Sequence, residues 1–122
     1  MEYITFLFLS MQEILIVVVS SSSSSLSLLT IFKVGKKRAY ELGLLLRDKY
    51  HKFLGDLYYP PNVYARSTWI IRTKMTLQLV LAALYPPVEI QKWNSELSWQ
   101  PVDIIYFPME EDDLLFPIMC SA

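Results

Sequence analysis

The chain has 122 residues, one Cys, one His, and a formal net charge of −1 from eleven basic and twelve acidic side chains. This length fits one small domain or part of a larger one. A charge so close to zero lacks the basic surface of a general nucleic-acid-binding protein, so no nucleic-acid partner is expected. One Cys and one His cannot by themselves build a structural zinc site, and one Cys cannot form an internal disulfide. We expect no metal and no cofactor.

Charge divides the chain into two unlike parts at residue 32. Residues 1–32 carry only two charged side chains, and residues 33–122 carry the other twenty-one. Residues 14–32 (ILIVVVSSSSSSLSLLTIF) are uncharged over a length that could span a bilayer as a helix, although six serines interrupt them. We therefore interpret residues 1–32 as a hydrophobic, serine-rich leader. The alternatives are an unfolded low-complexity segment, a signal or membrane anchor through residues 14–32, and a folded element.

Apolar spacing predicts an amphipathic helix over residues 36–53. The positions that recur at steps of three and four are Ala39, Leu42, Leu46, Tyr50 and Phe53. Gly55 is typical of a helix C-terminus, and the prolines that follow at 60 and 61 prevent the helix from resuming. His51 falls opposite the apolar stripe, which predicts a solvated surface histidine rather than a catalytic one.

A short strand and a second helix follow. Residues 62–66 (NVYAR) alternate in the manner of a strand. Ser67 and Thr68 are suitable N-caps for a helix that runs to about Leu84 and stops at the next proline pair. Apolar residues surround this helix almost completely, which predicts that it needs covering on several sides. An oligomer formed through this apolar helix is one way to cover it.

The C-terminal part combines a predicted strand with a run of acids. Residues 103–107 (DIIYF) have the composition of a strand. Residues 110–113 (EEDD) are expected to form a solvated loop or a helix start, with a cation site as the alternative. The order helix, strand, helix, strand predicts an α/β arrangement.

A family resemblance runs through residues 35–120. It is carried, in one order, by GKKRAYELGLLLRDKYHKFLGDLYYPPNVYARST, RTKM, LAALYPP, QKWN, LSWQPV and the closing acidic segment up to Cys120. Together these segments resemble the histidine acid phosphatases, of the prostatic/lysosomal type and the insect secreted or venom type. The resemblance implies that residues 33–122 are a partial domain of the histidine-phosphatase (phosphoglycerate-mutase-like) α/β fold, with an incomplete sheet and flanking helices.

The resemblance also implies a function. The family hydrolyses phosphate monoesters through a phosphohistidine, without a metal. For this chain we expect a place in the secretory pathway, as a secreted, lysosomal or membrane-associated protein, with residues 14–32 as the segment that would associate with a membrane. Arg66 matches the family's phosphate-binding arginine in the RST motif, so a phosphate monoester or phosphate anion is the expected partner. Cys120 matches a family cysteine that forms a disulfide with a cysteine farther along the chain.

Three departures from the family pattern bear on activity. The chain contains neither the RHGxRxP segment with the family's nucleophilic histidine nor the later His-Asp pair that supplies the proton donor. Trp69 and Ile71 replace two acids that precede Arg72 in the family pattern. We therefore expect a truncated, inactive piece of an acid phosphatase with no catalytic residue. The alternative is a non-catalytic membrane-associated or partner-binding protein.

Overall fold

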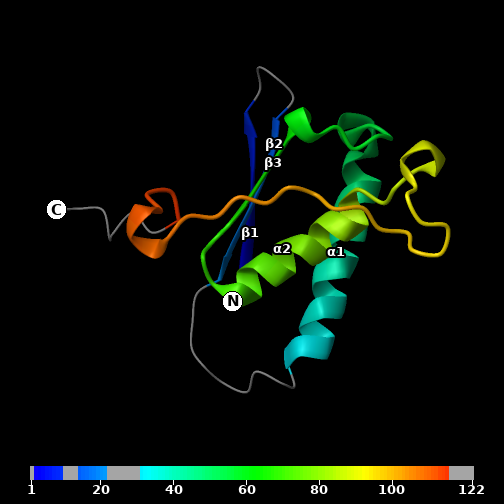
Figure 1. Ribbon diagram of the computed structural model, residues 1–122. Coiled ribbons are helices and arrows are strands. Elements are labelled where there is room, and N and C mark those ends of the chain that lie inside the picture. Colours follow the sequence, from blue (N-terminus) through cyan, green and yellow to red (C-terminus); the bar gives the residue numbers. More distant parts are fainter. Residues whose placement is uncertain (1, 10–13, 22–30, 116–122) are drawn as a thin grey trace.

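The computed structural model describes residues 2–9, 14–21 and 31–115. Its strands and helices are β1 (Glu2–Leu9), β2 (Ile14–Ser21), α1 (Ile31–Leu54), β3 (Val63–Ser67) and α2 (Ile71–Leu84). The three strands form one sheet in the order β1-β2-β3, in which β1 and β2 are antiparallel and β2 and β3 are parallel. The helix α2 packs on this sheet and α1 packs on α2 (Figure 1), which confirms the predicted α/β class.

The N-terminal region contributes two of the three strands. β2 places residues 15–19 beside β3 in parallel register. The division of the chain at residue 32 into a leader and a partial domain stays a prediction. Residues 14–32 do not form one continuous helix, because Ile14–Ser21 is a strand. In the described ranges, no helix has the length and apolar character to cross a membrane. A signal or anchor function for residues 1–32 stays a prediction.

The helix α1 is longer than predicted and changes direction near its end. Ala39 and Leu46 are buried, as the apolar spacing predicts. Tyr50 leaves the helical conformation, with φ −114° and ψ 17°. Beyond this point Phe53 is exposed and Leu54 packs against the core instead. The prediction for Phe53 is wrong because the periodicity argument assumes an unbroken helix.

Gly55 ends α1 as predicted. Its φ of 69° lies in the left-handed region that favours glycine, and its N–H donates to the carbonyl oxygen of His51 at 3.0 Å. A short 3₁₀ turn, Pro60–Asn62, then leads into β3. The strand predicted over residues 62–66 is confirmed within one residue at each end.

The start of α2 differs from the prediction. Its N-cap is Ile70, which makes no side-chain capping bond, so the prediction of a Ser67 or Thr68 cap is wrong. Ser67 still belongs to β3, and the extended backbone of Ile70 delays the helix. The hydroxyl of Thr73 pairs with that of Thr68 and donates to the carbonyl oxygen of Ile70 at 2.7 Å. These contacts connect the end of β3 to the first turn of α2.

The helix α2 packs against both the sheet and α1 (Figure 1). Its buried apolar residues are Leu77, Val80, Leu81, Ala83 and Leu84. The elements α1, β2 and β3 of the same chain contact this helix and cover its apolar residues. This corrects the reasoning that led to an oligomer through α2.

The strand predicted over residues 103–107 reduces to a single bridge. Ile105 donates its N–H to the carbonyl oxygen of Ala65 at 2.8 Å and accepts the N–H of Ser67 at 2.9 Å. Pro108 lacks an N–H and leads into a 3₁₀ turn, so the extended run stops there. This bridge places the residues that follow it next to the carboxyl end of β3.

Candidate functional site

Arg66 is fixed by backbone pairing on both sides of β3. It lies opposite Val18 in the ladder with β2, and opposite Ile105 at the bridge. Only 8% of the residue is exposed. The carboxyl ends of parallel strands are where ligands collect in open α/β sheets. Arg66 therefore lies where a binding residue is expected, on a rigid element.

The guanidinium of Arg66 forms a buried ion pair. Its Nη2 donates to Oδ1 of Asp112 at 2.6 Å, and Asp112 is 0% exposed. Asp113 lies farther away, with Oδ1 at 3.8 Å from the same nitrogen and 82% of its side chain exposed. Within the described residues, Arg66 Nε and Asp112 Oδ2 are buried without a hydrogen-bond partner. Asp112 thus engages one edge of the guanidinium through one oxygen.

An aromatic ring covers a face of the same guanidinium. The guanidinium carbon of Arg66 lies 4.6 Å from the ring centroid of Phe107, within the range of a cation–π interaction. Asp112 Oδ1 also accepts the backbone N–H of Leu115 at 3.0 Å. The carboxylate of Asp112 and the ring of Phe107 therefore both come from the segment that follows the Ile105 bridge.

Asp112 is the functional candidate that sequence reasoning missed. The prediction of a solvated run over residues 110–113 is correct for Glu110, Glu111 and Asp113, which are exposed, and wrong for Asp112. No cluster of three or more potential metal-ligating side chains occurs in the part of the chain that the structure describes. A buried arginine requires a carboxylate or an equivalent acceptor. The acidic run over residues 110–113 therefore indicates that a partner for Arg66 is present, but it does not indicate which of the four acids faces inward.

A second cationic group lies among aromatic rings beyond the end of β3. Lys74 Nζ lies 4.0 Å from the ring centroid of Tyr106 and 5.0 Å from that of Trp69. The two rings meet nearly edge to face, with centroids 5.7 Å apart. Trp69, which replaces an acid of the family pattern, thus binds a lysine through its ring.

The remaining sequence-predicted candidates do not join this site. His51 is exposed on α1, as predicted, and its Nδ1 lies 3.0 Å from the carbonyl oxygen of Asp48. Cys120 lies outside the described residues, so its disulfide stays a prediction.

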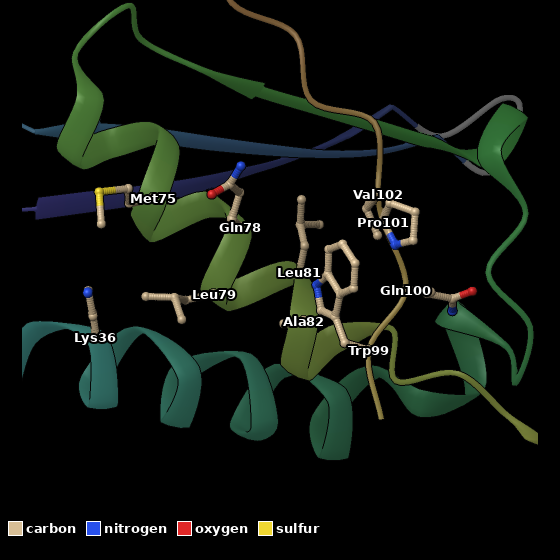
Figure 2. Close-up of a pocket in the computed structure, with 10 residues that line it drawn as sticks. All are labelled: Lys36, Met75, Gln78, Leu79, Leu81, Ala82, Trp99, Gln100, Pro101 and Val102. Carbon is tan, nitrogen blue, oxygen red and sulfur yellow. The ribbon is translucent and has the colours of Figure 1, made fainter. Parts of the chain in front are cut away.

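A separate cavity of about 570 Å³ lies between α1, α2 and residues 99–102. Figure 2 shows its lining, with Met75, Leu79 and Ala82 on α2, and Trp99 in the segment that follows. Among the described residues that line it, Lys36 of α1 is the one with a charged side chain. Arg66 is not part of it, so the cavity and the ion pair are distinct features.

Comparison with known proteins establishes the family. The family described as "Histidine phosphatase superfamily (branch 2)" matches residues 18–121, and the chain belongs to it. This confirms the resemblance and the expected partial histidine-phosphatase α/β fold. The matched residues begin within β2, so part of that strand falls inside the family domain.

Curated relatives of the chain are acid phosphatases. It is 51% identical to the venom acid phosphatase of Apis mellifera over 86 residues, which are 70% of this chain and 22% of that protein. It is 45% identical over 87 residues to the lysosomal acid phosphatase of Rattus norvegicus, covering 70% and 21%. It is 43% identical over 84 residues to the prostatic acid phosphatase of Homo sapiens, covering 69% and 22%. The chain spans about a fifth of these relatives' length.

Proposed function

We propose that this chain carries a phosphate-binding strand of the acid-phosphatase type, in which Arg66 binds the phosphate group of a monoester. The observation that carries the proposal is the nearly buried guanidinium at the carboxyl end of β3, held by Asp112 and Phe107. A planar guanidinium can donate to two phosphate oxygens at once, which a lysine cannot do. Membership in the family and the acid-phosphatase relatives support phosphate as the ligand.

We propose further that these 122 residues bind phosphate without hydrolysing the ester. A phosphohistidine mechanism needs an imidazole that attacks phosphorus. The sequence holds one histidine, His51. This residue is exposed on α1 and lies outside the site at Arg66. Arginine alone stabilises charge on the phosphoryl oxygens but supplies no nucleophile.

Titration with inorganic phosphate tests this function. We expect the wild-type chain to bind phosphate, Arg66→Ala to bind at least tenfold more weakly, and Arg66→Lys to fall between them because it keeps the charge without the planar fork. Calorimetry measures the affinity, and hydrolysis of p-nitrophenyl phosphate at acid pH measures turnover, for which we expect no signal.

The control for this titration is Arg38→Ala, which removes an exposed arginine of α1 and is expected to leave phosphate affinity unchanged. Circular dichroism checks that each variant is folded, because Arg66→Ala leaves Asp112 buried without its counter-ion. Equal phosphate affinity in wild type and Arg66→Ala contradicts the role of Arg66. Hydrolysis that is abolished in His51→Ala contradicts the absence of a nucleophile.

The secretory pathway is the compartment we propose for this protein. The relatives are named venom, lysosomal and prostatic acid phosphatases, and these names support secretion or delivery to lysosomes. A secreted, a lysosomal and a membrane-associated location each stay a prediction within that pathway.

A non-catalytic role in binding a partner is a second candidate. The cavity beside α2 favours it, because Met75, Leu79 and Trp99 give it a largely apolar lining (Figure 2). Replacing Leu79 by Glu would place a charge in this cavity while leaving Arg66 untouched. Loss of a partner with retained phosphate binding would favour this role over the phosphate site.

A further inference from the structure

We propose that Asp112 is a positioning residue for Arg66, which holds the guanidinium in the orientation that receives phosphate. The inference rests on the proposed function of Arg66 and deepens it. It adds to the strand residue a carboxylate that is 46 positions away in the sequence.

The first argument is that the carboxylate is itself fixed. Oδ1 of Asp112 accepts two hydrogen bonds, from Arg66 Nη2 at 2.6 Å and from the backbone N–H of Leu115 at 3.0 Å. The residue is 0% exposed, so water does not compete for this oxygen. A short hydrogen bond between charged groups is among the stronger ones in proteins. The guanidinium therefore meets an acceptor whose place is already determined.

The second argument is that the ion pair leaves the guanidinium available. A guanidinium has five N–H donors in a planar fork, and Asp112 engages it through one oxygen. Nε is buried, without a hydrogen-bond partner among the described residues, so the remaining donors for a ligand are those of the Nη groups. The ring of Phe107 restricts rotation of the guanidinium plane from its face, at 4.6 Å. Asp112 thus holds one edge of the guanidinium and Phe107 holds one face, while other N–H donors of the guanidinium remain for a ligand.

Asp112 could influence phosphate binding in two opposite ways. Holding Arg66 in place favours binding, because the flexible side chain loses no further conformational entropy when phosphate arrives. Placing a negative charge beside Arg66 disfavours the binding of an anion. We assign the larger effect to positioning, since the carboxylate is anchored to the backbone of Leu115 as well as to Arg66.

Two substitutions of Asp112 separate these effects in the whole 122-residue chain, titrated with inorganic phosphate. Asp112→Ala removes both the acceptor and the charge, and we expect phosphate affinity to fall at least tenfold. Asp112→Asn removes the charge but keeps an amide oxygen that accepts both hydrogen bonds, and we expect an affinity within threefold of wild type. Glu111→Gln is the matched control from the same acidic run, with an expected change below twofold because that side chain is exposed.

Recovery of phosphate affinity in Asp112→Asn relative to Asp112→Ala is the readout that a merely structural role would not give, and nuclear magnetic resonance of the Arg66 guanidinium measures whether its orientation is held. Slow rotation of its Nη groups is expected in wild type and in Asp112→Asn, and fast averaging in Asp112→Ala. If Asp112→Ala does not fold, Asp112→Leu takes its place, because leucine resembles aspartate in shape and accepts no hydrogen bond.

Two results would overturn the inference. One is phosphate binding in Asp112→Ala that is as tight as in wild type. The other is binding in Asp112→Asn that is tenfold tighter, since this would show that charge dominates. If these results occur while Arg66→Ala loses phosphate, only the positioning role fails. If Arg66→Ala binds phosphate as wild type does, the proposed function fails and the positioning role fails with it.

Discussion

At the scale of single residues, burial decides which charged and titratable groups act together. Arg66 and Asp112 meet in a place that water does not reach, so each neutralises the other. The ion pair of Arg47 with Asp56, at 3.8 Å, involves a carboxylate that is almost fully exposed. Exposed pairs of this kind contribute about 0–1 kcal/mol. Arg47 instead acts through carbonyl oxygens, since it donates to that of Gly55 at 2.6 Å.

Tyr85 gives a prediction for the pH dependence of stability. Burial raises its pKa from 10.0 to about 12, while Arg47 partly lowers it and Tyr58 raises it. In the unfolded chain tyrosine ionises near pH 10, so between pH 10 and 12 the unfolded state releases a proton that the folded state retains. The free energy of unfolding should therefore fall over this range. We expect wild type to lose about 2 kcal/mol more than Tyr85→Phe by pH 11.5, measured by urea unfolding.

Tyr59→Phe is the control for this measurement, because Tyr59 is exposed and the buried Tyr85 remains in that variant. It should follow the wild-type pH dependence. Parallel curves for Tyr85→Phe and wild type from pH 9 to 11.5 would show that burial does not retain this proton.

Sequence reasoning reached Arg66 but not its partner, and the reason is local geometry. The RST motif and the strand pattern before it identify Arg66 and its place at a strand end. Which of four consecutive acids faces inward depends on the 3₁₀ turn Met109–Glu111 and on the Ile105 bridge. Neither has a sequence signal strong enough to predict it.

At the scale of elements, α1 and α2 approach each other closely at Gly43. A Cβ added to this glycine would lie 2.5 Å from the carbonyl oxygen of Val80 and 2.6 Å from the Cβ of Ala83. Both distances are shorter than van der Waals contact. A glycine in the middle of a helix is locally unfavourable by roughly 1 kcal/mol relative to alanine, so its presence is explained by helix packing.

We predict that Gly43→Ala destabilises the chain although it raises helix propensity. The added methyl group must push α2 away, and overpacking of this kind destabilises by roughly 1–3 kcal/mol. Urea unfolding monitored by circular dichroism measures the change. Leu45→Ala, at an exposed position of α1, is the control and should change stability by less than about 0.5 kcal/mol. A more stable Gly43→Ala would show that the helices can separate freely.

The C-terminal ends of both helices were predicted from glycine and proline, and both predictions are confirmed. Gly55 ends α1, and α2 ends at Leu84 before the second proline pair. The predicted N-cap of α2 failed because capping propensity does not reveal how far a strand continues. Ser67 remains in β3 through its bond to Ile105, a contact between residues far apart in the sequence.

At the scale of the whole molecule, β2 is the centre of the sheet. It pairs with β1 on one side and with β3 on the other, and α2 packs against it. Its sequence ILIVVV is a continuous apolar run, which periodicity alone cannot assign to a strand or a helix. The order of the later elements therefore predicted the α/β class, whereas the sheet at the N-terminus could not be deduced.

We predict that residues 33–122 do not reach the folded state of the full chain when produced alone. Without β2, the strand that carries Arg66 loses its parallel ladder with residues 15–19 and becomes an unpaired edge that promotes association. Near-ultraviolet circular dichroism and thermal unfolding should show weaker tertiary structure and less cooperative melting. Residues 14–122, which keep β2, serve as the control and should retain more of both. If the chain 33–122 is monodisperse and melts at the same temperature as the full chain, the prediction is wrong, and residues 1–32 are not needed for folding.

The bridge at Ile105 also sets a limit on how this chain can vary in length. Six residues connect the bridge to Asp112, and each residue of extended chain covers at most about 3.3–3.6 Å. This connection behaves as a tether, so inserting or deleting one residue within it would turn a different acid toward the arginine. The loop between α2 and the bridge has no such constraint from the ion pair. Changes in length should therefore be rejected immediately downstream of the bridge, whereas the loop upstream is held by other contacts, such as the hydrogen bond from Gln100 Nε2 to the carbonyl oxygen of Tyr85 at 3.1 Å.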